Sequence, residues 1–224
     1  MDSLSSLRIF AIFIAIAIFI TKLRTPVRTR HKHSAGAGLK PEQVHVMRIS
    51  DNRYSRDRFR FDLALRFIRH EARTQTIRAW TGLSDDRIRK LYRSYLHEPG
   101  FAVGRPRGKS PQQCTFFTRS PRLKEETSFL ASLCSLLGVL PQAGTKVNQK
   151  ALANVSRGEL LCQAFEVYQQ LMPSGGISFE HAVFLVTALA RGDDLVLSNC
   201  GGCGAVIVLD RAAIGAPSCL HCAE

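Results

Sequence analysis

Apolar residues recur every three or four positions through much of this chain, which is the spacing of amphipathic α-helices. In residues 57–70, for example, Phe59, Leu63, Phe67 and Ile68 fall on one helical face. The pattern predicts a mostly α-helical protein with a hydrophobic core.

Three further helices are predicted in the second half of the chain, each beginning at a side chain that can cap its first turn. The expected caps are Ser120 (followed by Pro121), Ser156 and Ser178. Beyond the last helix, short apolar runs at residues 195–197 and 205–210 predict two strands of a ribbon-like hairpin.

Residues 71–93 carry the pattern of two helices joined by a tight turn. Gly82 lies in the turn, and Ser84 followed by two aspartates is typical of the start of a new helix. The apolar positions match those of a helix-turn-helix, and they are Ile77, Leu83, Ile88 and Leu91. Two interpretations stay open, a DNA-binding helix-turn-helix and an ordinary αα-hairpin with a solvated basic face.

Four cysteines near the end of the chain form the pattern C-x2-C-x15-C-x2-C, and they are Cys200, Cys203, Cys219 and Cys222. Two residues between cysteines let a tight turn point both sulfurs at one ion, and Zn²⁺ prefers four such ligands in a tetrahedron. Four thiolates leave no coordination position open, so we expect one structural Zn²⁺ per chain. The alternatives are two disulfides or a redox C-x-x-C motif.

The predicted fold class is therefore mostly α, with a helix-turn-helix-containing helical domain followed by a four-cysteine, zinc-ribbon-like element. The sequence divides into four segments. They are an amino-terminal extension (1–46), a basic helix-turn-helix region and loop (47–118), a helical region (119–194) and the zinc-binding element (195–224).

The formal net charge of +13 is concentrated in the first half of the chain. Residues 47–124 hold nineteen Lys and Arg against seven acids, whereas residues 125–224 hold five against nine. This asymmetry predicts that the first half binds a polyanion and the second half binds protein.

The candidate DNA-binding residues lie in the second helix of the pair and in the loop that follows. Opposite the apolar stripe of that helix lie Arg89, Lys90 and Arg93, together with Asp86, and Arg87 is a further candidate on the same helix. The loop GRPRGKSP adds Arg105, Arg107 and Lys109. Short Arg-Pro segments are typical of minor-groove contacts, and the alternative is a stiff, basic surface loop.

The run from Ile9 to Ile20 is twelve apolar residues, too short for an ordinary spanning helix of about twenty. Three interpretations compete: a membrane anchor, a signal peptide, or translation from a codon upstream of a native start at Met47. We favour the last, and with it a cytoplasmic protein.

Taken together, several motifs resemble the FlhC family, the C subunit of the bacterial flagellar master transcriptional activator. They are residues 86–92 (DRIRKLY), the Pro/Gly-rich loop, residues 177–182 (ISFEHA), and residues 197–200 (LSNC) leading into the cysteines. The resemblance covers about residues 60–222. The chain departs from the family at His181 and Val183, where the family usually has Arg and Trp, and residues 1–46 match nothing in it.

The resemblance implies a zinc protein that assembles with a small helical partner, the D subunit, binds promoter DNA and recruits RNA polymerase. We expect a transcriptional activator of flagellar or motility genes, and no motif of a catalytic site indicates an enzyme. Two alternatives remain: a zinc-ribbon interaction module that does not touch DNA, and a membrane-tethered regulator.

Overall fold

The computed structural model describes residues 49–96, 108–140, 152–213 and 215–223. Contacts divide the chain into two compact units, Met1–Val46 and Met47–Glu224, and all the described residues belong to the second. Among them, no helix is both long enough and apolar enough to cross a membrane. The apolar run at residues 9–20 lies outside the described part of the chain.

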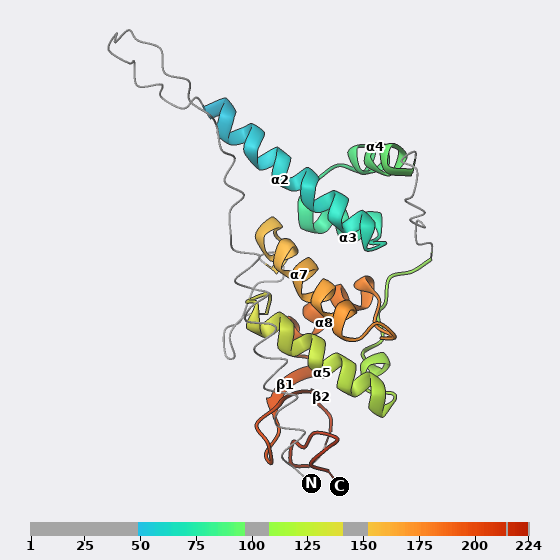
Figure 1. The fold of residues 1–224 in the computed structure, drawn as a ribbon, viewed down its shortest axis with the longest axis vertical. Coiled ribbons are helices and arrows are strands. Elements are labelled where there is room, and N and C mark those ends of the chain that lie inside the picture. Colours follow the sequence, from blue (N-terminus) through green and yellow to red (C-terminus); the bar gives the residue numbers. More distant parts are fainter. Residues whose placement is uncertain (1–48, 97–107, 141–151, 214, 224) are drawn as a thin grey trace, which may run out of the picture. The chain divides into compact units, whose positions relative to one another are not determined.

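The described part is mostly helical, as the sequence predicts, and it ends in a two-stranded hairpin (Figure 1). The helices are α2 (Ile49–Arg69), α3 (Thr74–Thr81), α4 (Asp85–Leu96), the 3₁₀ turn η1 (Cys114–Phe117), α5 (Pro121–Leu136), α7 (Val155–Leu171) and α8 (Phe179–Arg191). The antiparallel strands are β1 (Leu195–Asn199) and β2 (Val206–Asp210).

An aromatic cluster at the centre of the core joins four helices. Phe67 of α2 lies 4.9 Å from Phe179 of α8 and 6.1 Å from Trp80 of α3, measured between ring centroids. Phe165 of α7 lies 5.2 Å from Phe179. All four side chains are buried, so the helix pair α3–α4 is anchored to the same core as α7 and α8.

Side-chain caps fix the starts of the later helices. Ser120 accepts a hydrogen bond from the backbone N–H of Leu123 at the start of α5, and Ser178 accepts one from His181 at the start of α8. Both predicted caps are confirmed. The cap predicted at Ser156 is wrong, because Asn154 caps α7 by accepting from the N–H of Arg157.

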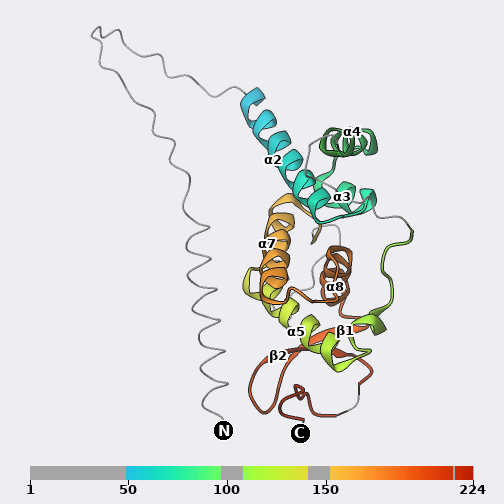
Figure 2. The same ribbon diagram turned by 45° about the vertical axis from the view of Figure 1, so that its right-hand side comes forward.

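Helix α2 begins earlier than its apolar pattern predicts, at Ile49. Leu63, Phe67 and Ile68 are buried as expected, but Phe59 is 64% exposed. The prediction for Phe59 is wrong because the first turns of α2 extend beyond α7, so that no core lies beneath them (Figures 1 and 2).

The terminal hairpin packs on α5 through β2 (Figure 2). Ile207 and Val208 are buried, and the N–H of Val208 donates to Ser128 Oγ of α5 at 3.1 Å. A side chain thus satisfies a backbone group that the strand edge would otherwise leave unpaired. The hairpin is thereby held by the helical core.

Candidate metal centre and basic surface

The four cysteines of the C-x2-C motifs come together at one end of the hairpin. Their sulfurs all lie within 4.8 Å of one another, and those of Cys203 and Cys219 are 3.6 Å apart. Four sulfurs around Zn²⁺ at 2.3 Å would be separated by about 3.8 Å along each edge of the tetrahedron. The spacing therefore fits a tetrahedral metal ion such as zinc.

The first cysteine pair occupies the loop of the hairpin. Cys200 follows β1 directly, and its N–H donates to the carbonyl of Ala205 at 2.8 Å, just before β2 begins. The N–H of Gly204, which has a φ of +73°, closes the turn on the carbonyl of Cys200. The strands hold both ends of this loop, so they set the positions of two of the four sulfurs.

The second pair reaches the first by backbone contacts from the segment after β2. The N–H of Gly201 donates to the carbonyl of Pro217 at 2.8 Å, and the N–H of Cys219 donates to the sulfur of Cys200 at 3.2 Å. A Cβ on Gly202 would lie 3.1 Å from the sulfur of Cys222, closer than most such contacts. A glycine at this position therefore gives the sulfurs room to converge.

The surroundings of the thiols differ in a way that favours metal binding. Backbone N–H groups, first that of Cys219, lower the pKa of Cys200 to about 6 because they stabilise its thiolate. The pKa of Cys222 is raised to about 12 by the sulfurs beside it, first that of Cys219. The neighbouring sulfurs therefore oppose the ionisation of one another. A divalent cation among the four sulfurs would remove this effect, because its charge stabilises the thiolates.

The proposed helix-turn-helix region consists of α3, a three-residue connection and α4. Gly82 ends α3 with a φ of +70°, a left-handed conformation that favours glycine, and its N–H donates to the carbonyl of Arg78 at 2.9 Å. Tyr92 of α4 donates its hydroxyl to the carbonyl of Ala72 at 2.5 Å. These bonds fix α4 against the corner between α2 and α3.

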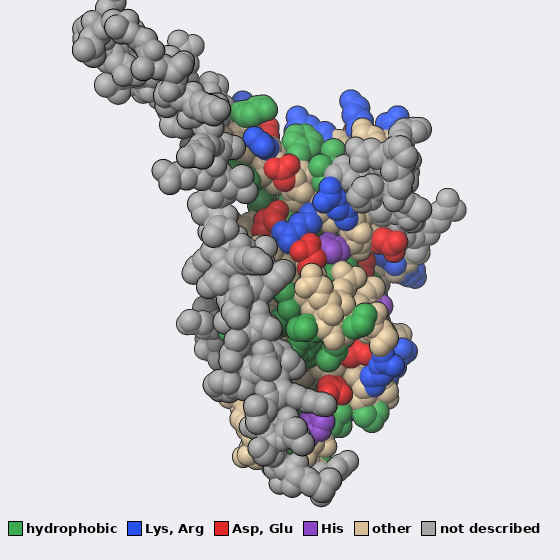
Figure 3. All heavy atoms as spheres, viewed as in Figure 1, with side chains coloured by type: hydrophobic (Ala, Val, Ile, Leu, Met, Phe, Trp, Pro, Cys, Tyr) green, Lys and Arg blue, Asp and Glu red, His purple; other side chains and the backbone are tan. Residues whose placement is uncertain are grey.

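The candidate DNA-binding residues of α4 are all exposed, and they are Arg87, Arg89, Lys90 and Arg93. Ile88 and Tyr92 are buried on the opposite side of the helix, whereas Leu91 is half-buried. Arg89 forms an ion pair with Asp86 at 3.2 Å. In Figure 3, Lys and Arg side chains gather over α2 and α4 at the top of the view.

The loop candidates are only partly described. Lys109 is exposed, and the carbonyl of the neighbouring Gly108 accepts a hydrogen bond from Arg73 at the corner between α2 and α3. Arg105 and Arg107 lie outside the described residues. The described end of the loop is therefore tied close to the start of α3.

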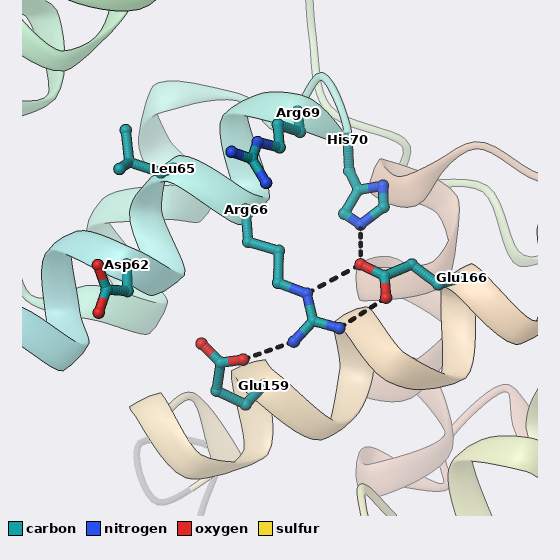
Figure 4. Close-up of a pocket in the computed structure, with 7 residues that line it drawn as sticks. All are labelled: Asp62, Leu65, Arg66, Arg69, His70, Glu159 and Glu166. Atoms are coloured by element: carbon teal, nitrogen blue, oxygen red, sulfur yellow. Dashed lines mark hydrogen bonds and ion pairs between the residues drawn. The ribbon is translucent and has the colours of Figure 1, made fainter. Parts of the chain in front are cut away.

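An ion-pair network between α2 and α7 has no signal in the sequence. Arg66 donates from Nε and Nη2 to the two carboxylate oxygens of Glu166, at 2.8 and 2.6 Å, and from Nη1 to Glu159 at 2.6 Å (Figure 4). His70 lies 3.0 Å from the same Glu166. Although burial opposes ionisation of Glu166, hydrogen bonds from His70 and Arg66 lower its pKa to about 2.

No family model matches this chain, and no curated protein matches it.

Proposed function

We propose that the chain is a zinc-containing, DNA-binding transcriptional activator of the FlhC type. It acts in a hetero-oligomer with a small helical partner like the flagellar D subunit, at promoters of flagellar or motility genes, and it recruits RNA polymerase there. The observation that carries the proposal is the exposed basic face of α4, held by a glycine turn and a buried opposite face.

In this proposal α4 is the recognition helix of a helix-turn-helix. Arg89, Lys90 and Arg93 would present donors to phosphates and to guanine edges in the major groove. Because Ile88 and Tyr92 bury the other side, the helix can meet DNA without leaving the core. The loop residues Arg105, Arg107 and Lys109 would contact the adjacent backbone or minor groove.

Zinc has a structural role in this proposal. Cys200, Cys203, Cys219 and Cys222 would hold one Zn²⁺, which would crosslink the hairpin loop to the terminal segment. The element would then present a rigid surface to protein partners. The four thiolates complete the coordination sphere and leave no position for a substrate.

One observation favours the alternative, a zinc-ribbon interaction module that does not touch DNA. Asp86 pairs with Arg89 at 3.2 Å, so part of the positive charge on α4 is neutralised within the helix. A helix that serves only as a scaffold would tolerate such pairing. The two functions differ in how binding to DNA responds to changes on α4.

The test is to replace Lys90 and Arg93 together by Ala in the full chain, purified with any partner that accompanies it. Each lost base-reading contact should weaken binding by about 1–3 kcal/mol. Fluorescence anisotropy would measure affinity for duplexes that the wild-type protein enriches from a random pool. Circular dichroism should be unchanged, since both side chains are exposed.

A matched control replaces Lys124 and Arg191 by Ala, which removes the same charge from exposed positions on α5 and α8. This control should keep the wild-type affinity. Equal affinity of all three proteins would assign α4 to the scaffold and favour the interaction module.

A further inference from the structure

The first half of α2 carries a second concentration of positive charge. Residues 53–60 are exposed except for the half-buried Asp57, and they include four arginines. The arginines are Arg53, Arg56, Arg58 and Arg60. The apolar pattern of the sequence does not assign this stretch a role.

One row of residues on α2 is covered to differing degrees along the helix. Asp57 and Phe61 are half-buried, and Ala64 and Ile68 are buried. Their spacing of four, three and four residues places them in one row along the helix. Helix α2 packs on both α3 and α4, and Phe61 of this row contacts α4.

The contact between Phe61 and Arg87 connects this row to α4. The guanidinium carbon of Arg87 lies 5.8 Å from the centroid of the Phe61 ring, a cation–π arrangement. Arg87 is exposed, so positive charge is present where the two helices meet. On a helical wheel with 100° per residue, Arg53 and Arg60 lie beside the same row. Their angles around the helix axis are about 50° and 70° from the centre of the row.

Arg58 lies on the other flank of the row and differs in its surroundings. It pairs with Asp62 at 3.9 Å, and Asp62 lines the hollow between α2 and α7 (Figure 4). Arg60 also has an acidic neighbour, Asp57 at 3.6 Å, but Asp57 belongs to the row itself. The two flanks of α2 therefore offer a test pair, Arg53 and Arg60, and a control position, Arg58.

We propose that α2 and α4 form one surface for duplex DNA, in which Arg53 and Arg60 bind backbone phosphates beside the groove that α4 enters. The inference rests on the proposed function and adds a second contact element to it. Duplex DNA suits this surface because arginine forks match phosphate oxygens and the charge continues from α4 through Arg87.

The experiment compares the full chain with the double variant R53Q/R60Q, and the control is R58Q/K124Q, which removes equal charge. The probe is a mixed-sequence duplex of about 30 base pairs, titrated at several KCl concentrations. Each phosphate contact contributes about −0.9 to the slope of log affinity against log salt. The variant should therefore bind several-fold more weakly, with a slope shallower by up to about 1.8, while the control keeps the wild-type slope.

The K90A/R93A protein in the same titrations separates the two proposals. If R53Q/R60Q matches its control while K90A/R93A loses affinity, the inference about α2 is overturned and the proposed function stands. A wild-type chain with no salt-dependent binding would overturn both. If R53Q/R60Q loses affinity for poly-glutamate but not for the duplex, the surface binds an acidic protein, and the inference is again wrong.

Discussion

Arg66 shows how the packing of two helices decides what a basic side chain does. In the sequence it is one of several arginines in an amphipathic stretch that favours polyanion binding. In the fold it is paired with Glu159 and Glu166 of α7 and only 24% of its side chain is exposed. Its charge is therefore used within the protein, and the partners could not be predicted because they lie 93 and 100 positions away.

The network makes stability depend on pH in a defined direction. The pKa of Glu166 in the folded protein is about 2, below the ordinary glutamate value of 4.5. A lowered pKa stabilises the fold above about pH 4.5, and that contribution is lost as the pH falls toward 2. Because 37% of the side chain is exposed, solvent screening should limit the effect to about 1 kcal/mol.

We expect the variant E166Q to lose this part of the pH dependence. Urea unfolding followed by circular dichroism at pH 7, 5, 4 and 3 would give the free energy of unfolding for wild type and variant. E125Q is the control, because Glu125 is an exposed carboxylate on α5. Parallel curves for wild type and E166Q would show that the network does not form in solution.

At the scale of elements, the sequence predicted the start of a helix correctly where that start depends only on neighbouring residues. Ser120 and Ser178 cap their helices because a cap involves only the next three residues. Asn154 was missed because it and Ser156 are both good caps two residues apart, and the sequence pattern does not choose between them. Phe59 was assigned to the core because the periodicity of apolar residues identifies the apolar face of a helix. It does not show whether another element covers that face along its whole length.

The four-cysteine cluster was the most predictable part of the candidate site. Its two C-x-x-C turns are short-range features, and only the approach of one pair to the other requires tertiary structure. The apolar run at residues 205–210 predicted β2, which starts at Val206 and follows directly after the first pair. The packing of β2 on α5, by contrast, has no sequence signal, because Ser128 lies 80 residues from Val208.

We expect the purified chain to hold one Zn²⁺, and C203S or C219S to lose it. Elemental analysis and thiol titration would measure metal content and free sulfhydryls together. Binding energy at such a site is also folding energy, and β2 packs on α5, so thermal stability should fall as well.

The control for the zinc experiment is C114S. Cys114 is not part of the four-sulfur cluster, and its thiol lies 3.6 Å from Asp194. This variant should keep one zinc per chain. A wild-type protein without zinc, with the four cysteines in disulfides, would contradict the assignment.

At the scale of the whole molecule, the basic first half and the acidic second half are partly joined to each other. Arg66 pairs with Glu159 and Glu166, and the backbone N–H of Arg73 donates to Glu180 of α8 at 2.8 Å. Each link connects a residue before position 124 to one after it. Within the described part of the chain, most of the exposed Lys and Arg of the first half lie on α2 and α4.

The described elements all belong to the compact unit Met47–Glu224, which leads to a prediction about the amino-terminal segment. We expect residues 47–224, expressed alone, to fold with unchanged thermal stability, to bind one zinc and to bind DNA as the full chain does. The reason is that the aromatic core, the cysteine cluster and the basic faces of α2 and α4 are complete within this unit.

The decisive measurement is complementation in cells that lack the native protein, with transcription of the target genes as the readout. The full chain serves as the positive control, and a 47–224 chain carrying K90A/R93A serves as the negative control. Loss of transcription with a truncated protein that is folded, zinc-loaded and able to bind DNA would show that residues 1–46 act in the cell. The membrane-tethered regulator would then replace our proposal, because an anchor is the function that folding, metal binding and DNA binding in solution would not detect.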